Sequence, residues 1–152
     1  MKTLVIGCVD NHLARQEIDR LKKCVVIDCG NSRQSGQVIL GDHADPNQFL
    51  NQFSAKPMRW RLSSLPSPYI MLPALLEPDP IPQPEGSCAE QIAQGEQHLL
   101  INQMIGLAAS SMVYRLLHRQ PITSFLTFAA IDPFATSSIT ITYEHLKSYL
   151  KP

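Results

Sequence analysis

The chain has 152 residues, of which 44% are hydrophobic and 17% are charged, and its 13 lysines and arginines balance 13 aspartates and glutamates. This length and composition predict one globular domain that is long enough to bury a substantial core. Because the net charge is zero and basic residues do not cluster, we expect neither a nucleic-acid partner nor an anionic membrane surface.

Four cysteines are present, and none belongs to a C-x-x-C motif, which disfavours a structural zinc site. The apolar run at the start of the sequence is short and ends at Asp10, so it does not resemble a signal peptide. We therefore expect a cytoplasmic location and free thiols. Three of the cysteines, Cys8, Cys24 and Cys29, fall on apolar runs and are expected to be packing residues on buried strands.

The N-terminal segment predicts a βαβ unit. Residues 2–9 are largely apolar and indicate a central, fully buried strand, and residues 24–29 indicate a second one. The intervening residues 11–23 carry apolar side chains at helical spacing and predict a helix. Two strands joined by a helix are expected to lie parallel in one sheet.

The expected helix has an apolar face formed by Ala14, Ile18 and Leu21. Arg15 is expected to lie mostly away from this face. Asp10 precedes the helix at the expected carboxyl end of the first strand, which is where open α/β sheets place their ligands. The alternative is that Asp10 only ends the strand or caps the helix.

The middle of the sequence changes character. Residues 36–41 predict a third strand, and its short connection favours antiparallel pairing at a sheet edge. Most of the 12 prolines lie between residues 57 and 84, which excludes long helices and central strands. We therefore expect one domain with a βαβ unit plus edge strand over residues 1–56, a proline-rich crossover over 57–86, and a long helix with a terminal hairpin over 87–152.

A long helix is expected to begin at Ser87 or Cys88 and to run to Leu117, with Gly95 as a candidate break. Its last 19 residues carry a single charge, at Arg115, and approach the length of a membrane span. Polar residues interrupt this stretch, so a helix buried inside the domain is the preferred interpretation.

Two strands are expected at the end of the chain, over residues 124–131 and 138–143. The second has the alternation Ile-Thr-Ile-Thr, which is typical of a half-exposed strand. Asp132-Pro133 is a turn signal between them, so we expect an antiparallel hairpin.

The segment VIGCVDNHLARQEIDRLKKCVVIDCGNSRQSGQVILG resembles the second half of the ThiF/MoeB superfamily domain. Members of that superfamily are ATP-dependent adenylating enzymes related to ubiquitin-activating enzymes. Their pattern here is a strand ending in Asp-Asn, a following Arg and helix, a second strand, and G-x-V. The matching residues are Asp10, Asn11, Arg15, Asp28, Gly36 and Val38.

Within the superfamily, the residue pattern of this motif is most similar to that of the ThiF-like proteins of PRTRC systems. Asn31, Gln37 and Gly41 contribute to this likeness, as do Cys88 and Asn102 in the later segment SCAEQIAQGEQHLLINQMI. The resemblance covers residues 3–41 and, less specifically, residues 86–118.

The resemblance implies a partial Rossmann-like α/β fold with a mixed sheet that lacks the glycine-rich, nucleotide-binding βαβ half. It implies ATP and Mg²⁺ as cofactors, with Asp10 near the phosphates as the Mg²⁺ ligand. It also implies that Asn11 and Arg15 shape this site, although an ion-pair role for Arg15 is favoured over a direct phosphate contact.

Cys88 lies at an expected helix start, where a thiol pKa can be lowered. The resemblance implies a catalytic role, in which Cys88 takes the activated C-terminus of a ubiquitin-like protein as a thioester. The alternative is that Cys88 is a small apolar packing residue.

The seven glycines form no G-x-G-x-x-G motif. We therefore expect a half-domain that is inactive alone and completes an adenylating site with a complementing N-terminal half-domain, supplied by another chain or an upstream reading frame. The first strand would then expose one edge as an assembly surface, and a homo-oligomer acting on a ubiquitin-like or other protein substrate is expected. The alternatives are a non-catalytic ThiF-like dimerisation or protein-binding module, and a small α/β protein of unrelated function.

Overall fold

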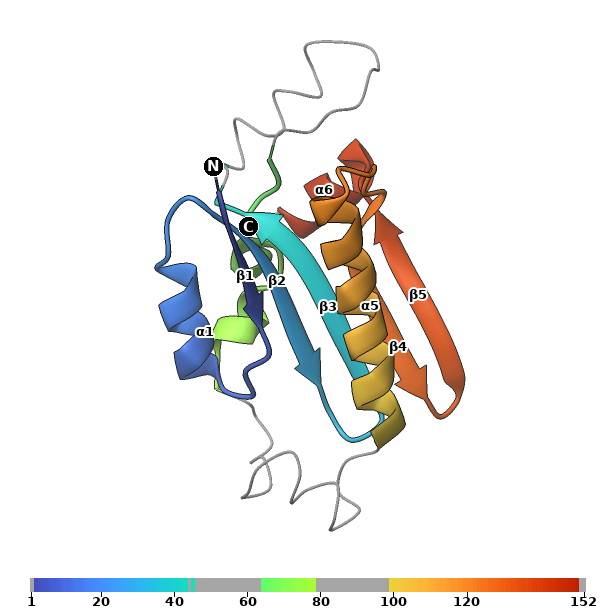
Figure 1. Ribbon diagram of the computed structural model, residues 1–152. Coiled ribbons are helices and arrows are strands. Elements are labelled where there is room, and N and C mark those ends of the chain that lie inside the picture. The colour runs from blue at the N-terminus through green and yellow to red at the C-terminus, as the bar shows by residue number, and fades with distance from the viewer. Residues whose placement is uncertain (1, 44, 46–63, 79–98, 151–152) are drawn as a thin grey trace.

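The computed structural model describes residues 2–43, 45, 64–78 and 99–150. Within these residues the chain forms a mixed five-stranded sheet in the order β1-β2-β3-β4-β5, with helices on both faces (Figure 1). The first pair of strands is parallel, and every other neighbouring pair is antiparallel. The strands are β1 (Thr3–Gly7), β2 (Cys24–Asn31), β3 (Ser35–Asp42), β4 (Ser124–Ile131) and β5 (Phe134–Thr140). The expected α/β class with a mixed sheet is confirmed.

The predicted parallel βαβ unit is present, with α1 (His12–Asp19) between β1 and β2. The helix ends earlier than predicted, at the C-cap Arg20, and Leu21 is 44% exposed beyond it. Arg15 is the buried residue of α1, so the prediction that it lies away from the packed face was wrong. The physical reason is a buried carboxylate on β2 that draws the guanidinium inward.

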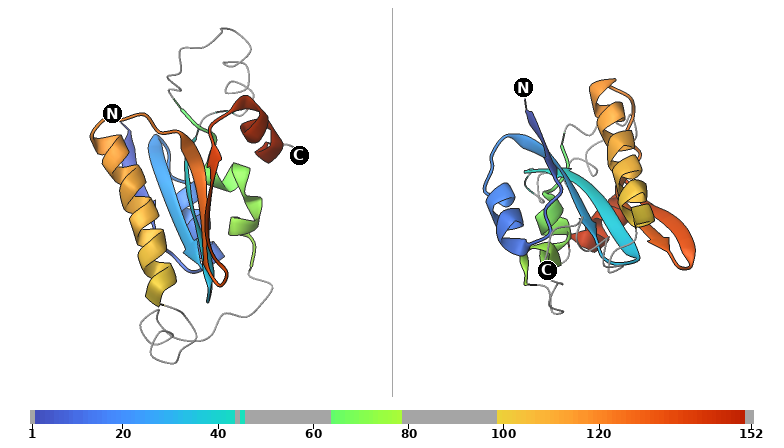
Figure 2. Two further views of the ribbon diagram at one scale, coloured as in Figure 1. Left: turned by 90° about the vertical axis from the view of Figure 1, so that its right-hand side faces the viewer. Right: turned by 60° about the horizontal axis from the view of Figure 1, so that its bottom comes forward.

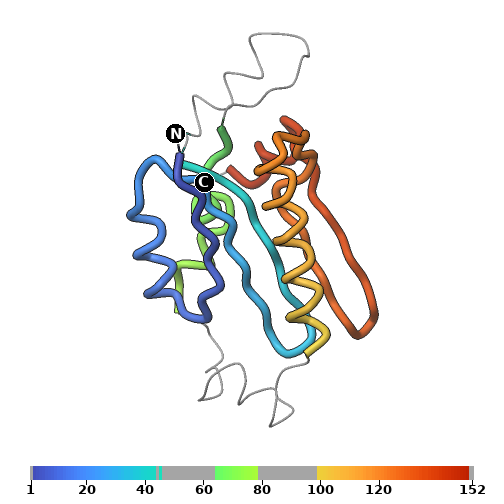
Figure 3. The backbone as a smooth tube through the Cα atoms, viewed as in Figure 1, coloured from blue at the N-terminus to red at the C-terminus, as the bar shows by residue number. Residues whose placement is uncertain are grey.

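The positions of β1 and β3 in the sheet are the reverse of those predicted. β1 pairs with β2 alone among the described strands, and Ile6 is 48% exposed, so β1 is an edge strand rather than a central, fully buried one (Figure 3). β3 lies in the middle of the sheet because β4 pairs with its second edge. The expected open edge on the first strand is thus present among the described residues.

Two helical layers cover the sheet. Figure 2 shows α5 (Leu99–Leu117) on one face and α1, α3 (Pro68–Met71) and α6 (Tyr143–Tyr149) on the other. One side of α5 is buried, but Leu107 on the other side is 74% exposed, so α5 lies at the surface and is not the helix buried inside the domain that was expected. Among the helices of the described residues, none has both the length and the apolar content for crossing a bilayer.

The main core lies between these layers and is built from buried residues of β2, β3, β4, α5 and α6. Ile27, Ile39 and Phe125 are among its fully buried side chains. A smaller cluster of Cys24, Val26 and Tyr69 packs where α1 and the 3₁₀ helix η1 (Pro73–Leu76) cover the first two strands. This smaller cluster fixes α1 against β2.

The described part of the proline-rich segment, residues 64–78, contains only the short helices α3 and η1, as the prolines predict. The Ser67 hydroxyl accepts a hydrogen bond from the amide of Tyr69, and Pro68 follows at the first helical position. A Cβ on Gly41 would lie 2.2 Å from the carbonyl oxygen of Pro66. Glycine at residue 41 therefore lets this segment approach β3.

The terminal hairpin is confirmed, and β4 has the predicted bounds. Its second strand, β5, spans Phe134–Thr140 rather than residues 138–143, because Thr142 caps α6 by accepting from the amide of His145. The helix α6 was not expected from the sequence. The expected start of the long helix near Ser87 lies outside the described residues.

Candidate functional site

A cleft of about 760 Å³ lies at the carboxyl end of the parallel strands β1 and β2. Residues of α1 and η1 line it on one side, and residues of α5 line it on the other. Its polar lining includes Asp10, Asn11, Arg15, Asn31, Glu77 and Asn102. This is the edge of the sheet at which open α/β folds bind their ligands.

Asp10 and Asn11 have different roles at the start of α1. The Asn11 side-chain oxygen accepts a 2.8 Å hydrogen bond from the amide of Ala14, so Asn11 is the N-cap. The alternative assignment of Asp10 as the helix cap was therefore wrong. Asp10 is exposed and lines the cleft, and its Oδ1 accepts a 3.2 Å hydrogen bond from the Asn11 side-chain amide.

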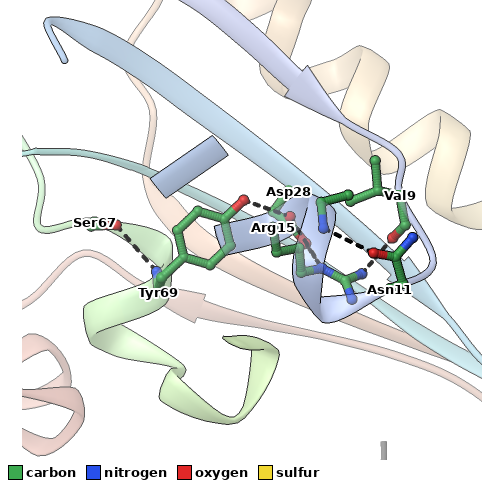
Figure 4. Close-up of polar contacts among 7 residues, drawn as sticks. Val9, Asn11, Arg15, Asp28, Ser67 and Tyr69 are labelled. Carbon is green, nitrogen blue, oxygen red and sulfur yellow. Dashed lines mark hydrogen bonds and ion pairs between the residues drawn. The ribbon is translucent and has the colours of Figure 1, made fainter. Parts of the chain in front are cut away.

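Behind this exposed pair lies a buried ion pair between Arg15 and Asp28 (Figure 4). Arg15 Nε donates to the two carboxylate oxygens of Asp28 at 3.2 and 3.4 Å, and Nη2 donates to the Val9 carbonyl at 2.8 Å. The Tyr69 hydroxyl donates to Asp28 Oδ2 at 2.9 Å. The expected ion-pair role of Arg15 is confirmed, and its partner is the Asp28 of the sequence motif.

Burial governs the protonation of this network. Removal from water raises the pKa of the Asp28 carboxyl, while the charge of Arg15 and the hydrogen bond from Tyr69 oppose the rise. Burial also raises the pKa of the Tyr69 phenol, and the adjacent Asp28 charge adds to the effect. Tyr69 therefore stays a neutral donor over the physiological range. The network ties α1, β2 and α3 together beneath the cleft.

Amide side chains line the opposite part of the cleft. The Asn31 side-chain amide on β2 donates to the side-chain oxygen of Asn102 on α5, which joins the sheet to the helix. Gln37 also lines the cleft, and a Cβ on Gly30 would lie 2.6 Å from its Nε2. Several residues of the N-terminal motif are thus brought together with Asn102 at one surface, namely Asp10, Asn11, Arg15, Asn31 and Gln37. The motif residues Asp28, Gly36, Val38 and Gly41 do not line this cleft.

The described lining contains the carboxylates of Asp10 and Glu77, and Arg15 is its only lysine or arginine. No group of three histidine, cysteine or acidic side chains within the described residues is arranged to hold a metal ion. Mg²⁺ is commonly held by one or two carboxylates together with phosphate oxygens and water. Asp10 fits such a role as a single ligand, provided that a nucleotide supplies the others.

The cysteines do not all behave as predicted. Cys24 and Cys29 are buried, as expected, whereas Cys8 is exposed and lines the cleft because β1 ends at Gly7. The prediction of Cys8 as a buried packing residue was wrong. Cys88, the candidate nucleophile, lies outside the described residues.

Two residues of the site were missed in the sequence, Tyr69 and Glu77, since both fall in the proline-rich segment. The signal that could have located Tyr69 is Ser67-Pro68, an N-cap followed by proline at the first helical position. Neither residue type nor spacing indicates its contact with Asp28, because the two are 41 residues apart.

No protein-family model matches the sequence, and no curated protein matches it either. Two features of the molecule bear on function, the cleft itself and the sequence pattern around Asp10.

Proposed function

We propose that this chain is a ThiF-like half-domain of an ATP-dependent adenylating system, inactive alone, that completes a nucleotide site with a partner chain. The observation that carries the proposal is the placement of Asp10. Its carboxylate is exposed at the carboxyl end of the β1–β2 pair and lines a cleft of about 760 Å³. A cleft of this size falls in the range of small-molecule and cofactor sites.

In the proposed site, Asp10 would hold Mg²⁺ together with the phosphates of ATP, and the metal would offset charge that develops on the α-phosphate. Asn11 would keep this carboxylate at the helix start, since its side chain bonds both Asp10 and the backbone of Ala14. Arg15 would act from below, by holding the Val9 carbonyl and hence the turn that carries Asp10.

The charges of the described cleft support the need for a partner chain. Its one arginine already donates to Asp28 and to a backbone carbonyl, and two carboxylates share the lining. A triphosphate would need further cationic or amide donors. The edge of β1 that no other described strand covers is a surface through which a second half-domain or a second copy of the chain would supply them.

The second candidate is a non-catalytic ThiF-like module for dimerisation or protein binding. It is favoured by the engagement of Arg15 and by exposed apolar side chains on β1 and α5, of which Ile6 is 48% and Leu107 is 74% exposed. This candidate predicts a stable homo-oligomer that binds no nucleotide. Sedimentation of the chain alone, with and without ATP, measures both properties.

The test of the first proposal is ATP–pyrophosphate exchange with a ubiquitin-like protein that ends in Gly-Gly. The chain alone should show no exchange, and the proposal predicts exchange when the product of the neighbouring reading frame is added as the source of the glycine-rich half-domain. Absence of exchange and of nucleotide binding in the mixture would reject the split enzyme and favour the binding module.

The decisive variant is Asp10→Asn, which removes the charge and keeps the side-chain size. It should abolish exchange without altering thermal stability, because Asp10 is exposed. Glu17→Gln is the matched control, since Glu17 is an exposed carboxylate of α1 that does not line the cleft. Equal loss of exchange in both variants would assign the effect to helix charge rather than to a ligand role of Asp10.

A further inference from the structure

Two cysteines lie side by side at the edge of the candidate cleft. The parallel register pairs Gly7, the last residue of β1, with Asp28, and the residues that directly follow these two are Cys8 and Cys29. Both line the cleft. The pair directly before them, Gly7 and Asp28, lies on neighbouring strands, which are about 4.8 Å apart, and disulfides span Cα separations of about 4.4–6.8 Å. In a parallel pair, residues at matching positions point to the same face of the sheet.

The two thiols differ in access. Cys8 is exposed, whereas Cys29 is 8% exposed and packs in the main core with Val38 and Ile105. Burial raises the pKa of the Cys29 thiol to about 12, and the neighbouring Cys8 thiol adds to the rise. A dissolved oxidant therefore reaches Cys8 first, and Cys29 is placed to react with what forms there.

We propose that Cys8 and Cys29 are a redox pair that closes to a disulfide when the protein meets a peroxide. The Cys8 sulfur attacks one oxygen of hydrogen peroxide, the O–O bond breaks, and a sulfenic acid and one water form. The Cys29 sulfur then attacks the Cys8 sulfur, the S–S bond forms, the S–O bond breaks, and a second water leaves with the thiol proton. Two thiols lose two electrons in all, and one peroxide gains them.

The disulfide would act on the candidate cleft through the chain itself. Cys8 precedes Val9, whose carbonyl accepts from Arg15, and Asp10 comes next. Oxidation would therefore tie the turn that carries Asp10 to β2, at the point where the two strands separate. A small dithiol would reduce this disulfide again, and such reversibility is typical of the transient disulfides found in reducing compartments. The pair does not depend on a nucleotide role for Asp10.

The experiment treats the full chain with an equimolar amount of hydrogen peroxide and measures its mass without reduction. The expected product is a monomer that has lost two hydrogens and regains them with dithiothreitol. Tryptic digestion should then link the peptide of residues 3–15 to the peptide of residues 24–33. The second peptide also contains Cys24, so Cys24→Ser is included and should keep the link.

The matched variants are Cys8→Ser and Cys29→Ala, and each should lose the link. In Cys29→Ala no disulfide can follow the sulfenic acid, so treatment with at least two equivalents of peroxide should give the mass of a sulfinic acid at Cys8, with circular dichroism used to check folding. The wild-type link is a readout that does not depend on whether either variant folds. Accumulation of sulfinic acid at Cys8 in the wild-type chain, or a link from Cys8 to Cys88 or to a second molecule, would overturn the proposal.

Discussion

The hydroxyl of Tyr69 donates a 2.9 Å hydrogen bond to Oδ2 of Asp28, and the two residues are only 2% and 0% exposed. Asp28 also accepts from Arg15, so one buried carboxylate holds together a strand, the helix that crosses to it and a short helix from the proline-rich segment. A buried charge of this kind is tolerated only while its partners remain.

Removal of the guanidinium should be strongly destabilising. We expect Arg15→Met to lower the free energy of unfolding by about 3–5 kcal/mol, because Asp28 is left buried without its cation. The double variant Arg15→Met/Asp28→Asn should recover a large part of this loss, since it has no buried charge. Urea denaturation of the four members of the cycle measures the coupling. If the stability losses of the two single variants simply add in the double variant, the two side chains are not coupled.

The pair of Arg15 and Asp28 should also make the stability of the protein depend on pH. The pKa of Asp28 is raised in the folded protein, so its contribution to stability is fully present below the unfolded pKa of about 3.9 and is lost as the pH rises through the folded value. Arg15→Met removes the cation that opposes this rise. The variant should therefore gain more stability than the wild type on going from about pH 8 to about pH 5. If the free energy of unfolding changes equally with pH in the two proteins, the charge of Arg15 does not influence the pKa of Asp28.

Loss of the Tyr69 hydroxyl should have a smaller effect. We expect Tyr69→Phe to cost about 1–3 kcal/mol, because one oxygen of a buried carboxylate loses its donor while the ring packing is kept. Tyr114→Phe is the matched control, since Tyr114 is 53% exposed on α5. Its stability should stay within about 0.5 kcal/mol of the wild type. Thermal denaturation distinguishes the two variants.

Tyr69 should also resist ionisation at alkaline pH. Its pKa is raised by burial and by Asp28, so the stability it contributes is present below the ordinary tyrosine pKa of about 10 and is lost as the pH rises above that value. In an ultraviolet titration of the four tyrosines, one should therefore ionise only when the protein unfolds. In Tyr69→Phe this late phase should be missing.

Two glycines should respond to alanine in opposite directions. Gly41→Ala would place a Cβ 2.2 Å from the Pro66 carbonyl oxygen, and we expect a loss of about 1–3 kcal/mol from the forced backbone shift. Gly106→Ala meets nothing within 4 Å and lies inside α5, so it should stabilise the protein by about 0.5–1 kcal/mol. Denaturant unfolding of both variants tests this contrast, and a neutral Gly41→Ala would mean that the Pro66 segment moves freely.

Substitutions of Asn11 and Asp10, at the start of α1, should differ in their effect on stability. Asn11→Ala removes the N-cap and should cost about 0.5–2 kcal/mol. Asp10→Ala should leave thermal stability nearly unchanged, because that side chain is exposed and makes no bond to the helix backbone among those described. A larger loss for Asp10→Ala than for Asn11→Ala would contradict the assignment of Asn11 as the N-cap.

Local patterns predicted the elements whose causes are local. The bounds of β4 and the turn at Asp132-Pro133 follow from a mainly apolar run with two phenylalanines and from a turn dipeptide, which act over a few residues. The N-terminal βαβ unit follows in the same way from periodicity. The end of α1 was placed too late, because Leu21 continues the apolar spacing although the helix has already ended at Asp19.

The order of strands could not be predicted, because it depends on contacts between distant segments. An apolar run such as residues 3–7 is expected both for a strand with one neighbour and for a strand with two. The strand β3 is central because it pairs with β4, which lies almost ninety residues later in the sequence. At the site, the sequence located Asp10, Asn11 and Arg15. It could not show that Arg15 turns inward, since that depends on Asp28.

The partners of Asp28 also imply an order of assembly. Arg15 lies 13 residues away and Tyr69 lies 41 residues away, so the ion pair can form within the N-terminal βαβ unit, whereas the phenol must close a much longer loop. We therefore expect the carboxylate to stay hydrated until α3 docks, late in folding. Consequently we expect the Tyr69 contact to be absent from the folding transition state, so its loss should speed unfolding and leave the folding rate almost unchanged.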